Sequence, residues 1–266
     1  MLQTAIEAAR RASRVMAERF SRAHDVTVKG YRDIVTDVDT AAEAVVLDLI
    51  HERFPGHVIL SEEAGGDGIG DGYTWVVDPL DGTTNYSRRI PSFAVSIGVL
   101  ENGESVIGVV CDPLRDQLFV AERGKGATLN GEPMHTSRVA HLGNAVVSLD
   151  WGRSDVDRAR TLDLVRQVAM RCGTVRALGS AVLAQCYVAA GWLDAYFNLI
   201  MKPWDAAAGT LIVAEAGGRC TMVDGGPYRV GVAGCLATNG LIHDEILSAM
   251  SDACLSWLPR EARGSR

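Results

Sequence analysis

A short apolar run that leads directly into two aspartates is the feature that most constrains this chain. Residues 73–77 read YTWVV, and the chain continues as DPLDGTTNY at 78–86. The run is rich in β-branched and aromatic residues, which predicts a strand, and we expect Pro79 to end it because proline cannot donate to a strand ladder. Asp78 and Asp81 then lie on one tight turn. On its own, this turn is equally typical of a surface loop, because Asp-Pro and Asp-Gly are ordinary turn dipeptides.

Further carboxylates stand at the ends of other predicted elements. Glu62 lies in SEE at 61–63, directly after an apolar run at 58–60, and Asp205 ends PWD at 203–205, where we expect a helix to begin. Such carboxylates are typical oxygen ligands of a hard divalent cation. A carboxylate that bridges two cations is the arrangement used for in-line phosphoryl displacement. If the turn at Gly82 and Thr83 opens a helix, its backbone N–H groups suit a phosphate.

The spacing of apolar residues predicts a mixture of helices and short strands. We expect helices at 3–21, 38–54, 155–171, 180–191 and 205–216 and a last helix opening at 244–250, with strands at 58–60, 73–77, 93–100, 106–111, 117–121 and 195–198. The strands outnumber those of a regular βαβ alternation and the helices come in blocks. This predicts an α+β fold in which helices cover mixed, mainly antiparallel sheets. We also expect the core to contain Trp75, Trp151, Trp192 and Trp204.

Charge and composition narrow the class of partner. Apolar residues make up 47% of the 266 residues and the formal net charge is −7. This charge argues against nucleic acid or an anionic membrane as the main partner, because both select basic patches. The six cysteines form no C-x-x-C pair, which favours free thiols in a reducing compartment. Charged residues interrupt the N-terminal apolar stretch and no run approaches the roughly 18 residues of a membrane span, so we expect a cytoplasmic, soluble protein.

Several segments together resemble the signature of the inositol monophosphatase family. In family order they are KGYRDIVTDVD at 29–39, FPGHVILSEE at 54–63, DPLDGTTNY at 78–86, GKGATLNG at 124–131, GSAVLAQCYVAAGWLDAYF at 179–197 and PWDAAAGTLIVAEAGG at 203–218. The resemblance implies a magnesium-dependent, lithium-sensitive phosphatase of small polar phosphomonoesters. It also implies a small-molecule phosphate as partner, a homodimer, and two or three Mg²⁺ ions per active site.

The same resemblance implies a layered αβαβα sandwich of the inositol monophosphatase and fructose-1,6-bisphosphatase type, with mixed, mainly antiparallel sheets. One catalytic domain is expected over 1–266. Its N-terminal α+β half ends at about residue 140, and its C-terminal α/β half spans about 141–260. We expect residues 261–266 to be a frayed tail.

Residue by residue, the resemblance implies three sets of site residues. The implied metal ligands are Glu62, Asp78, the backbone carbonyl of Leu80, Asp81 and Asp205. The implied catalytic residues are Lys29, Asp39 and Thr83. The implied substrate-binding residues are Gly82, Thr83, Ser180, Ala181, Asn198 and Asp205.

Within these sets, Thr83 and Asp39 match the pair that holds and activates the attacking water, and Lys29 matches a lysine that helps to organise a bound water. Asp39 is preferred to Asp37 because the family pattern is valine-threonine-x-x-aspartate, which matches VTDVD at 35–39. Asp37 is expected at the helix start, where its charge suits the helix dipole. Glu63 is expected to be solvated or to support a metal ligand without binding the ion itself.

One position departs from the family pattern. Asn198 stands where a substrate-binding glutamate is common, and an amide keeps hydrogen-bonding capacity but lacks the negative charge. Lys202 adds a positive charge near the same rim, which favours a second phosphate or carboxylate on the substrate or is simply solvated. For Arg176 the sequence leaves two roles open, one in the active site and one in a subunit interface. Fructose 1,6-bisphosphate and histidinol phosphate are therefore alternative substrates, and a regulatory protein that binds RNA or transcription machinery is the alternative outside enzymes.

Overall fold

The computed structural model describes residues 1–22 and 24–257, so the expected tail at 261–266 lies outside the described residues. The helices are α1 (Leu2–Arg19), α2 (Asp37–Arg53), α3 (Thr83–Ser87), α4 (Asp155–Ala169), α5 (Ala181–Ala189), α6 (Pro203–Ala206), α7 (Gly209–Glu215) and α8 (His243–Trp257). The strands are β1 (Val26–Gly30), β2 (Asp33–Thr36), β3 (Val58–Ser61), β4 (Tyr73–Asp81), β5 (Ala94–Glu101), β6 (Glu104–Asp112), β7 (Gln117–Glu122), β8 (Ala127–Leu129), β9 (Glu132–Pro133), β10 (Val146–Leu149), β11 (Thr174–Arg176), β12 (Ala195–Asn198), β13 (Arg219–Thr221) and β14 (Cys235–Thr238). A short 3₁₀ turn spans Leu142–Asn144.

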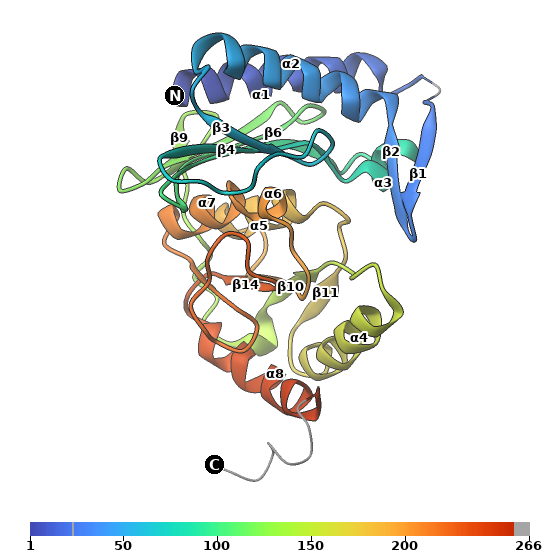
Figure 1. Cartoon of the computed structure of the whole chain (residues 1–266). Helices are drawn as coiled ribbons and strands as arrows, with labels where there is room; N and C mark the ends of the chain where they lie inside the picture. The colour runs from blue at the N-terminus through green and yellow to red at the C-terminus, as the bar shows by residue number, and fades with distance from the viewer. Residues whose placement is uncertain (23, 258–266) are drawn as a thin grey trace.

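The elements stack in alternating layers of helix and sheet (Figure 1). Helices α1 and α2 cover the outer face of a seven-stranded sheet, and α5, α6 and α7 lie between it and a five-stranded sheet. Helices α4 and α8 cover the far side of the five-stranded sheet. The predicted αβαβα sandwich is confirmed. Among the described residues, no helix is both long and apolar enough to cross a membrane.

Both large sheets are mixed. The seven-stranded sheet has the order β3-β4-β5-β6-β7-β8-β9, and only its β3–β4 pair is parallel. The five-stranded sheet has the order β11-β10-β12-β14-β13, with β10 parallel to both of its neighbours and the remaining pairs antiparallel. A separate antiparallel hairpin joins β1 and β2.

Buried apolar side chains fill the spaces between the layers. One cluster joins the small residues of α1, such as Ala8 and Ala12, to Val95 and Ile97 of β5. A second cluster surrounds α5 and α7 and reaches both large sheets. A third lies between the five-stranded sheet and helices α4 and α8. Burial of apolar area on both faces of each sheet stabilises this stack at roughly 25 cal/mol per Å² removed from water.

Two predicted elements differ from the observed ones. The strand expected at 73–77 continues to Asp81, because β4 passes the proline through an irregularity and pairs again at Asp81 with Ala94 of β5. The helix expected at 205–216 is two helices, α6 and α7. At the break, the carbonyl of Asp205 accepts a hydrogen bond from Gln185 Nε2 at 2.7 Å and the carbonyl of Ala207 accepts one from Ser105 Oγ at 2.8 Å.

Two glycines allow the α6–α7 segment to lie directly on the seven-stranded sheet. Gly98 of β5 and Gly108 of β6 are opposite each other in the ladder. A Cβ at Gly98 would lie 2.6 Å from the Cβ of Ala207, and one at Gly108 would lie 2.7 Å from the carbonyl oxygen of Ala208. Side chains at these positions would push the segment away. The close approach therefore brings the start of α6 to the end of β4.

The expectation for the tryptophans holds only in part. Trp75 is fully buried, whereas Trp151 is 40% exposed and Trp192 is 49% exposed. Trp204 is partly buried, and both Trp151 and Trp204 line a cavity described below.

Candidate active site

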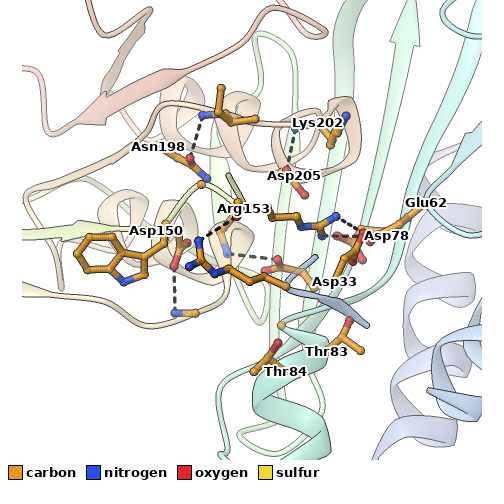
Figure 2. Close-up of a pocket in the computed structure, with 18 of the residues that line it drawn as sticks. Asp33, Glu62, Asp78, Thr83, Thr84, Asp150, Arg153, Asn198, Lys202 and Asp205 are labelled. Carbon is orange, nitrogen blue, oxygen red and sulfur yellow. Dashed lines mark hydrogen bonds and ion pairs between the residues drawn. The ribbon is translucent and has the colours of Figure 1, made fainter. Parts of the chain in front are cut away.

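A cavity of about 570 Å³ lies where the end of β4 meets the ends of β10 and β12. Its lining includes Glu62, Asp78, Asp81 and Asp205, together with Thr83 at the start of α3. Figure 2 shows Glu62 and Asp78 on one side of this cavity and Asp150 and Asn198 on the other. The acidic segments that the sequence separates by more than a hundred residues thus meet in one place.

The turn after β4 fixes the first two aspartates. The backbone N–H of Leu80 donates to Asp78 Oδ1 at 3.0 Å, which holds that carboxylate against its own strand. Asp81 faces the start of α5, where the Ser180 hydroxyl and the N–H groups of Ala181 and Val182 donate to it. Free N–H groups at a helix start suit a negative charge. Both carboxylates are buried and have fixed orientations.

Two other acidic residues are fixed as the third residue of a helix. Asp205 Oδ2 accepts a hydrogen bond from the N–H of Lys202 at 2.8 Å, at the start of α6. Asp39 Oδ2 accepts one from the N–H of Thr36 at 2.9 Å, at the start of α2, and Thr36 accepts in return from Val38. This reciprocal capping is a local sequence effect that places a carboxylate at a known point beside a helix end.

The carboxylates of Asp78, Asp81 and Asp205 form a cluster. One oxygen of each lies within 4.8 Å of one oxygen of both others. Burial, followed by repulsion from Glu62 and Asp81, raises the pKa of Asp78 well above its usual range. Burial also raises the pKa of Asp81 to about 6 and that of Asp205 to about 8. These shifts show that the cluster disfavours its own negative charge, which a bound cation would offset.

Glu62 lies beside this cluster and contacts two cationic side chains. Its N–H donates to the carbonyl of Val77 at 3.1 Å, so it stands next to Asp78. Lys29 Nζ is 3.6 Å from Glu62 Oε1 and 2.6 Å from Glu63 Oε1, and an Arg153 nitrogen is 3.9 Å from Glu62 Oε1. Burial raises the pKa of Glu62 to about 7, against the lowering effect of Lys29.

Thr83 and Asp39 form a hydrogen-bonded pair at the edge of the cavity. The Thr83 hydroxyl lies 2.9 Å from Asp39 Oδ1, to which it donates, and 3.1 Å from the Leu80 carbonyl. Gly82, which precedes it, has φ +94°, a conformation that L side chains rarely adopt. A Cβ there would also lie 2.9 Å from the Ser92 carbonyl, so glycine is required for this turn into α3.

The structure brings most of the remaining predicted site residues to the cavity. Gly82, Ala181, Asn198 and the ambiguous Lys202 line it. Ser180 is fully buried, and its hydroxyl faces Asp81.

Three of the singled-out residues lie beside the cavity or away from it. Lys29 contacts Glu62 and Glu63 from the β1–β2 hairpin. Arg176 is exposed on β11, where it donates to Thr174. Asp37 is exposed at the start of α2, as expected, and lies 3.6 Å from Arg19.

The loop after β10 supplies cavity residues that sequence reasoning missed. Asp150, Trp151 and Arg153 all line the cavity. Arg153 forms an ion pair with Asp33 of the hairpin, and Arg32 lies 2.9 Å from Asp155 at the start of α4. The loop and the hairpin therefore hold each other beside the cavity. No motif marks these residues. The one available signal was a carboxylate directly after a short β-branched run at 146–149.

Comparisons with known proteins agree with this fold. Residues 1–254 match the model of the inositol monophosphatase family. The chain is 39% identical to a protein of Escherichia coli (strain K12) named Nus factor SuhB over 264 residues, which is 98% of this chain and 99% of that protein. It is 38% identical over 262 residues, 95% of this chain and 70% of the other, to an Arabidopsis thaliana protein named phosphatase IMPL1, chloroplastic.

Solved structures extend the likeness to the whole fold. An IMPase of Thermotoga maritima superposes with a TM-score of 0.88 at 36% identity, over 96% of this chain and 98% of that one. A Mycobacterium tuberculosis SuhB superposes with a TM-score of 0.80 at 34% identity, over 95% and 96% of the two chains. Because the family model spans nearly the whole sequence and these likenesses cover both sheets, the chain belongs to the inositol monophosphatase family of phosphatases.

Proposed function

We propose that the protein is a magnesium-dependent phosphomonoesterase that hydrolyses a small polyol phosphate, such as an inositol monophosphate or a related sugar phosphate. The observation that carries this proposal is the cluster of Asp78, Asp81 and Asp205, which opens into a cavity beside the Thr83–Asp39 pair. The volume of about 570 Å³ lies in the range of small-molecule sites.

The donor set fits Mg²⁺. Hard cations of this kind select carboxylate and carbonyl oxygens. Mutual repulsion and burial of these carboxylates disfavour the cluster unless positive charge balances it. The residues proposed to hold two or three ions are Glu62, Asp78, the Leu80 carbonyl, Asp81 and Asp205. Bound there, Mg²⁺ supplies positive charge that offsets the phosphate and the charge developing on the leaving oxygen.

Thr83 and Asp39 are proposed to accept the proton of the attacking water. Because the Thr83 hydroxyl donates to Asp39, its lone pairs are free to accept a hydrogen bond from water. Burial raises the pKa of Asp39 above its usual value, which makes this carboxylate a better proton acceptor. The water oxygen then bonds to phosphorus and its proton passes through Thr83 to Asp39. The bond from phosphorus to the ester oxygen breaks with its electron pair on that oxygen, and the leaving alkoxide takes a proton from solvent water.

The turn at Gly82 is proposed to hold the phosphoryl oxygens. Gly82, Thr83 and Thr84 line the cavity, and the first N–H groups of a helix lack partners within it. Lys29 is proposed to act through Glu62 and Glu63, since its Nζ contacts both carboxylates. These contacts fix the position of Glu62 beside Asp78.

Relatives support a small phosphomonoester as substrate. Structures of a related enzyme, SaIMPase-II, are described as bound to inositol monophosphate and to 2'AMP, at 28% and 30% identity and TM-scores of 0.80 and 0.77. Fructose 1,6-bisphosphate and histidinol phosphate are the alternatives. Lys202 lines the cavity, and its positive charge favours a substrate with a second phosphate. Asp150 and Asp205 also line the cavity, and their negative charges disfavour such a substrate.

A phosphate-release assay tests this proposal directly. The purified protein is incubated with Mg²⁺ and a panel of inositol, sugar, amino-alcohol and nucleotide phosphates, with and without a chelator. We expect release from polyol phosphates that stops with chelator. Inhibition by Li⁺, uncompetitive or mixed with respect to substrate, is also expected, because Li⁺ brings half the charge of Mg²⁺ to the same ligands. Absence of release across the panel would contradict the proposal.

A second candidate function follows from the relatives named Nus factor SuhB. That name favours a role with RNA or the transcription machinery for this chain as well. The net charge of −7 argues against direct nucleic-acid binding. A nitrocellulose filter assay with RNA, run beside the phosphate-release assay, separates the two functions. The homodimer and the cytoplasmic location stay predictions, which light scattering and cell fractionation test.

A further inference from the structure

Asp150 is a cavity carboxylate that the chemistry above does not use. It follows the last residue of β10, and Asn198 is the last residue of β12. These strands are parallel neighbours with Leu149 opposite Phe197, and the N–H of Asp150 continues the ladder to the Phe197 carbonyl at 3.4 Å. Asp150 and Asn198 are therefore next in register at the same sheet edge, and both line the cavity.

Two neutral donors hold the Asp150 carboxylate in place. The hydroxyl of Tyr196, a fully buried residue, donates to Oδ2 at 3.0 Å, and the N–H of Gly179 donates to Oδ1 at 3.2 Å. Asn198 Nδ2 in turn donates to the Tyr196 oxygen at 3.4 Å. Each carboxylate oxygen has about two acceptor sites, so each keeps one for a further donor. The Asp150 oxygens can therefore accept further hydrogen bonds from a ligand, and neither of the two donors that hold them is charged.

The same short segment relates Asp150 to the phosphate side of the cavity. Gly179 donates to Asp150, and the next residue, Ser180, donates through its hydroxyl to Asp81. The two carboxylates therefore contact adjacent residues of this segment. On the proposed function, a group that contacts Asp150 would lie beside the phosphate held at the cluster, on the side of the leaving group. Trp151, 40% exposed, adds an apolar surface there.

We propose that Asp150, paired with Asn198, binds hydroxyl groups of the leaving polyol and is a specificity-determining residue of this site. Burial raises the pKa of Asp150 to about 7, so the ionised form dominates above that pH. In this form the carboxylate is an acceptor only, so it accepts from two adjacent hydroxyls and repels a second phosphate or carboxylate. The inference rests on the proposed phosphatase function. The inference also accounts for Asn198. The negative charge that this position lacks is supplied by Asp150, which follows the neighbouring strand β10.

The test compares Asp150→Asn with the wild type on two substrates. Inositol 1-phosphate carries hydroxyls beside the ester, and 4-nitrophenyl phosphate carries none on its leaving group. We expect the ratio of kcat/KM for inositol 1-phosphate to kcat/KM for 4-nitrophenyl phosphate to fall about tenfold or more, mainly through KM. Asp163→Asn, which removes an exposed charge on α4 away from the cavity, is the matched control and should leave the ratio unchanged.

Asp150→Glu keeps the charge and should recover part of the ratio, which a purely structural role would not predict. An equal change for both substrates, or no change for either, would overturn the assignment of Asp150 while leaving the phosphatase function intact. If the wild type releases phosphate from neither substrate with Mg²⁺ present, the proposed function itself fails, and the role of Asp150 fails with it.

Discussion

The two sides of the cavity differ in how firmly their residues are held. On the cluster side, formed by Asp78, Asp81 and Asp205, backbone N–H groups fix every carboxylate, two of them at helix starts. On the other side, called here the β10 side, the loop after β10 carries Trp151 at 40% exposure and Arg153 with 54% of its side chain exposed.

This difference separates two tasks. The cluster side holds carboxylates at fixed points, where bound cations would bring positive charge to a phosphate, as phosphoester hydrolysis requires. The β10 side, which also includes Asp150 and Asn198, is proposed to contact whatever is attached to the phosphate. We infer that chemistry depends on the cluster side and substrate choice on the β10 side.

The largest effect should come from Asp78→Asn, which removes a charge from the centre of the cluster and keeps its shape. Phosphate release should fall by more than about 10⁴-fold, because proton transfer alone accounts for 10²–10⁴-fold and the cluster supports every other contribution as well. Initial rates with saturating Mg²⁺ measure this, with Asp163→Asn as the charge control. Strong turnover by the variant would break the proposed division between the two sides.

Thr83→Ala should have the next largest effect. It removes the hydroxyl that lies 2.9 Å from Asp39, so kcat should fall about 100-fold with a smaller change in KM. Thr83→Ser keeps the hydroxyl and should retain most of the rate. If the alanine variant changes KM alone, Thr83 binds substrate and does not handle the proton.

How far the sequence predicts the site also differs between the sides. Asp78, Asp81 and Thr83 belong to one continuous segment, and Asp39 and Asp205 lie in short segments of their own, so the resemblance to the family implies a role for each from the sequence. Asp150 becomes recognisable only when β10 lies beside β12, a pairing between segments nearly fifty residues apart. Periodicity predicted the α+β mixture of helices and sheets and the family resemblance implied its layering, whereas the α6–α7 break depends on Gln185 and Ser105 from elsewhere in the chain.

Asn198→Glu should change substrate choice more than the maximal rate. A second carboxylate beside Asp150 should raise kcat/KM for inositol 1-phosphate relative to fructose 1,6-bisphosphate by about tenfold. The comparison requires both substrates on both proteins. An identical factor for the two substrates would show that this part of the β10 side does not contact the leaving group.

The smallest expected effect is on stability and depends on pH. Folded-state pKa values of about 8 for Asp205 and about 7 for Glu62 exceed the ordinary values of 3.8 and 4.5. Without metal, the folded protein therefore holds protons that the unfolded chain releases between about pH 4 and 8. The stability these groups contribute is complete below pH 4 and is lost as pH rises through 7 to 8.

Mg²⁺ should replace those protons, so it should raise Tm by a few degrees at pH 8 and by less at pH 5.5. Thermal unfolding with Mg²⁺ or with EDTA at both pH values measures this. Asp205→Asn should reduce the difference between the two pH values. A larger rise in Tm with Mg²⁺ at pH 5.5 than at pH 8 would show that Mg²⁺ binds at a site other than these carboxylates.

The central claim is that Asp78, Asp81 and Asp205 form a metal centre, and anomalous diffraction from crystals soaked in Mn²⁺ tests it most directly. Mn²⁺ prefers the same oxygen ligands as Mg²⁺ and can be located by its anomalous signal. We predict an anomalous peak among these three carboxylates, within direct coordination distance of their oxygens, and loss of the peak in Asp78→Asn. A wild-type map without a peak there, at saturating Mn²⁺ and neutral pH, would contradict the account.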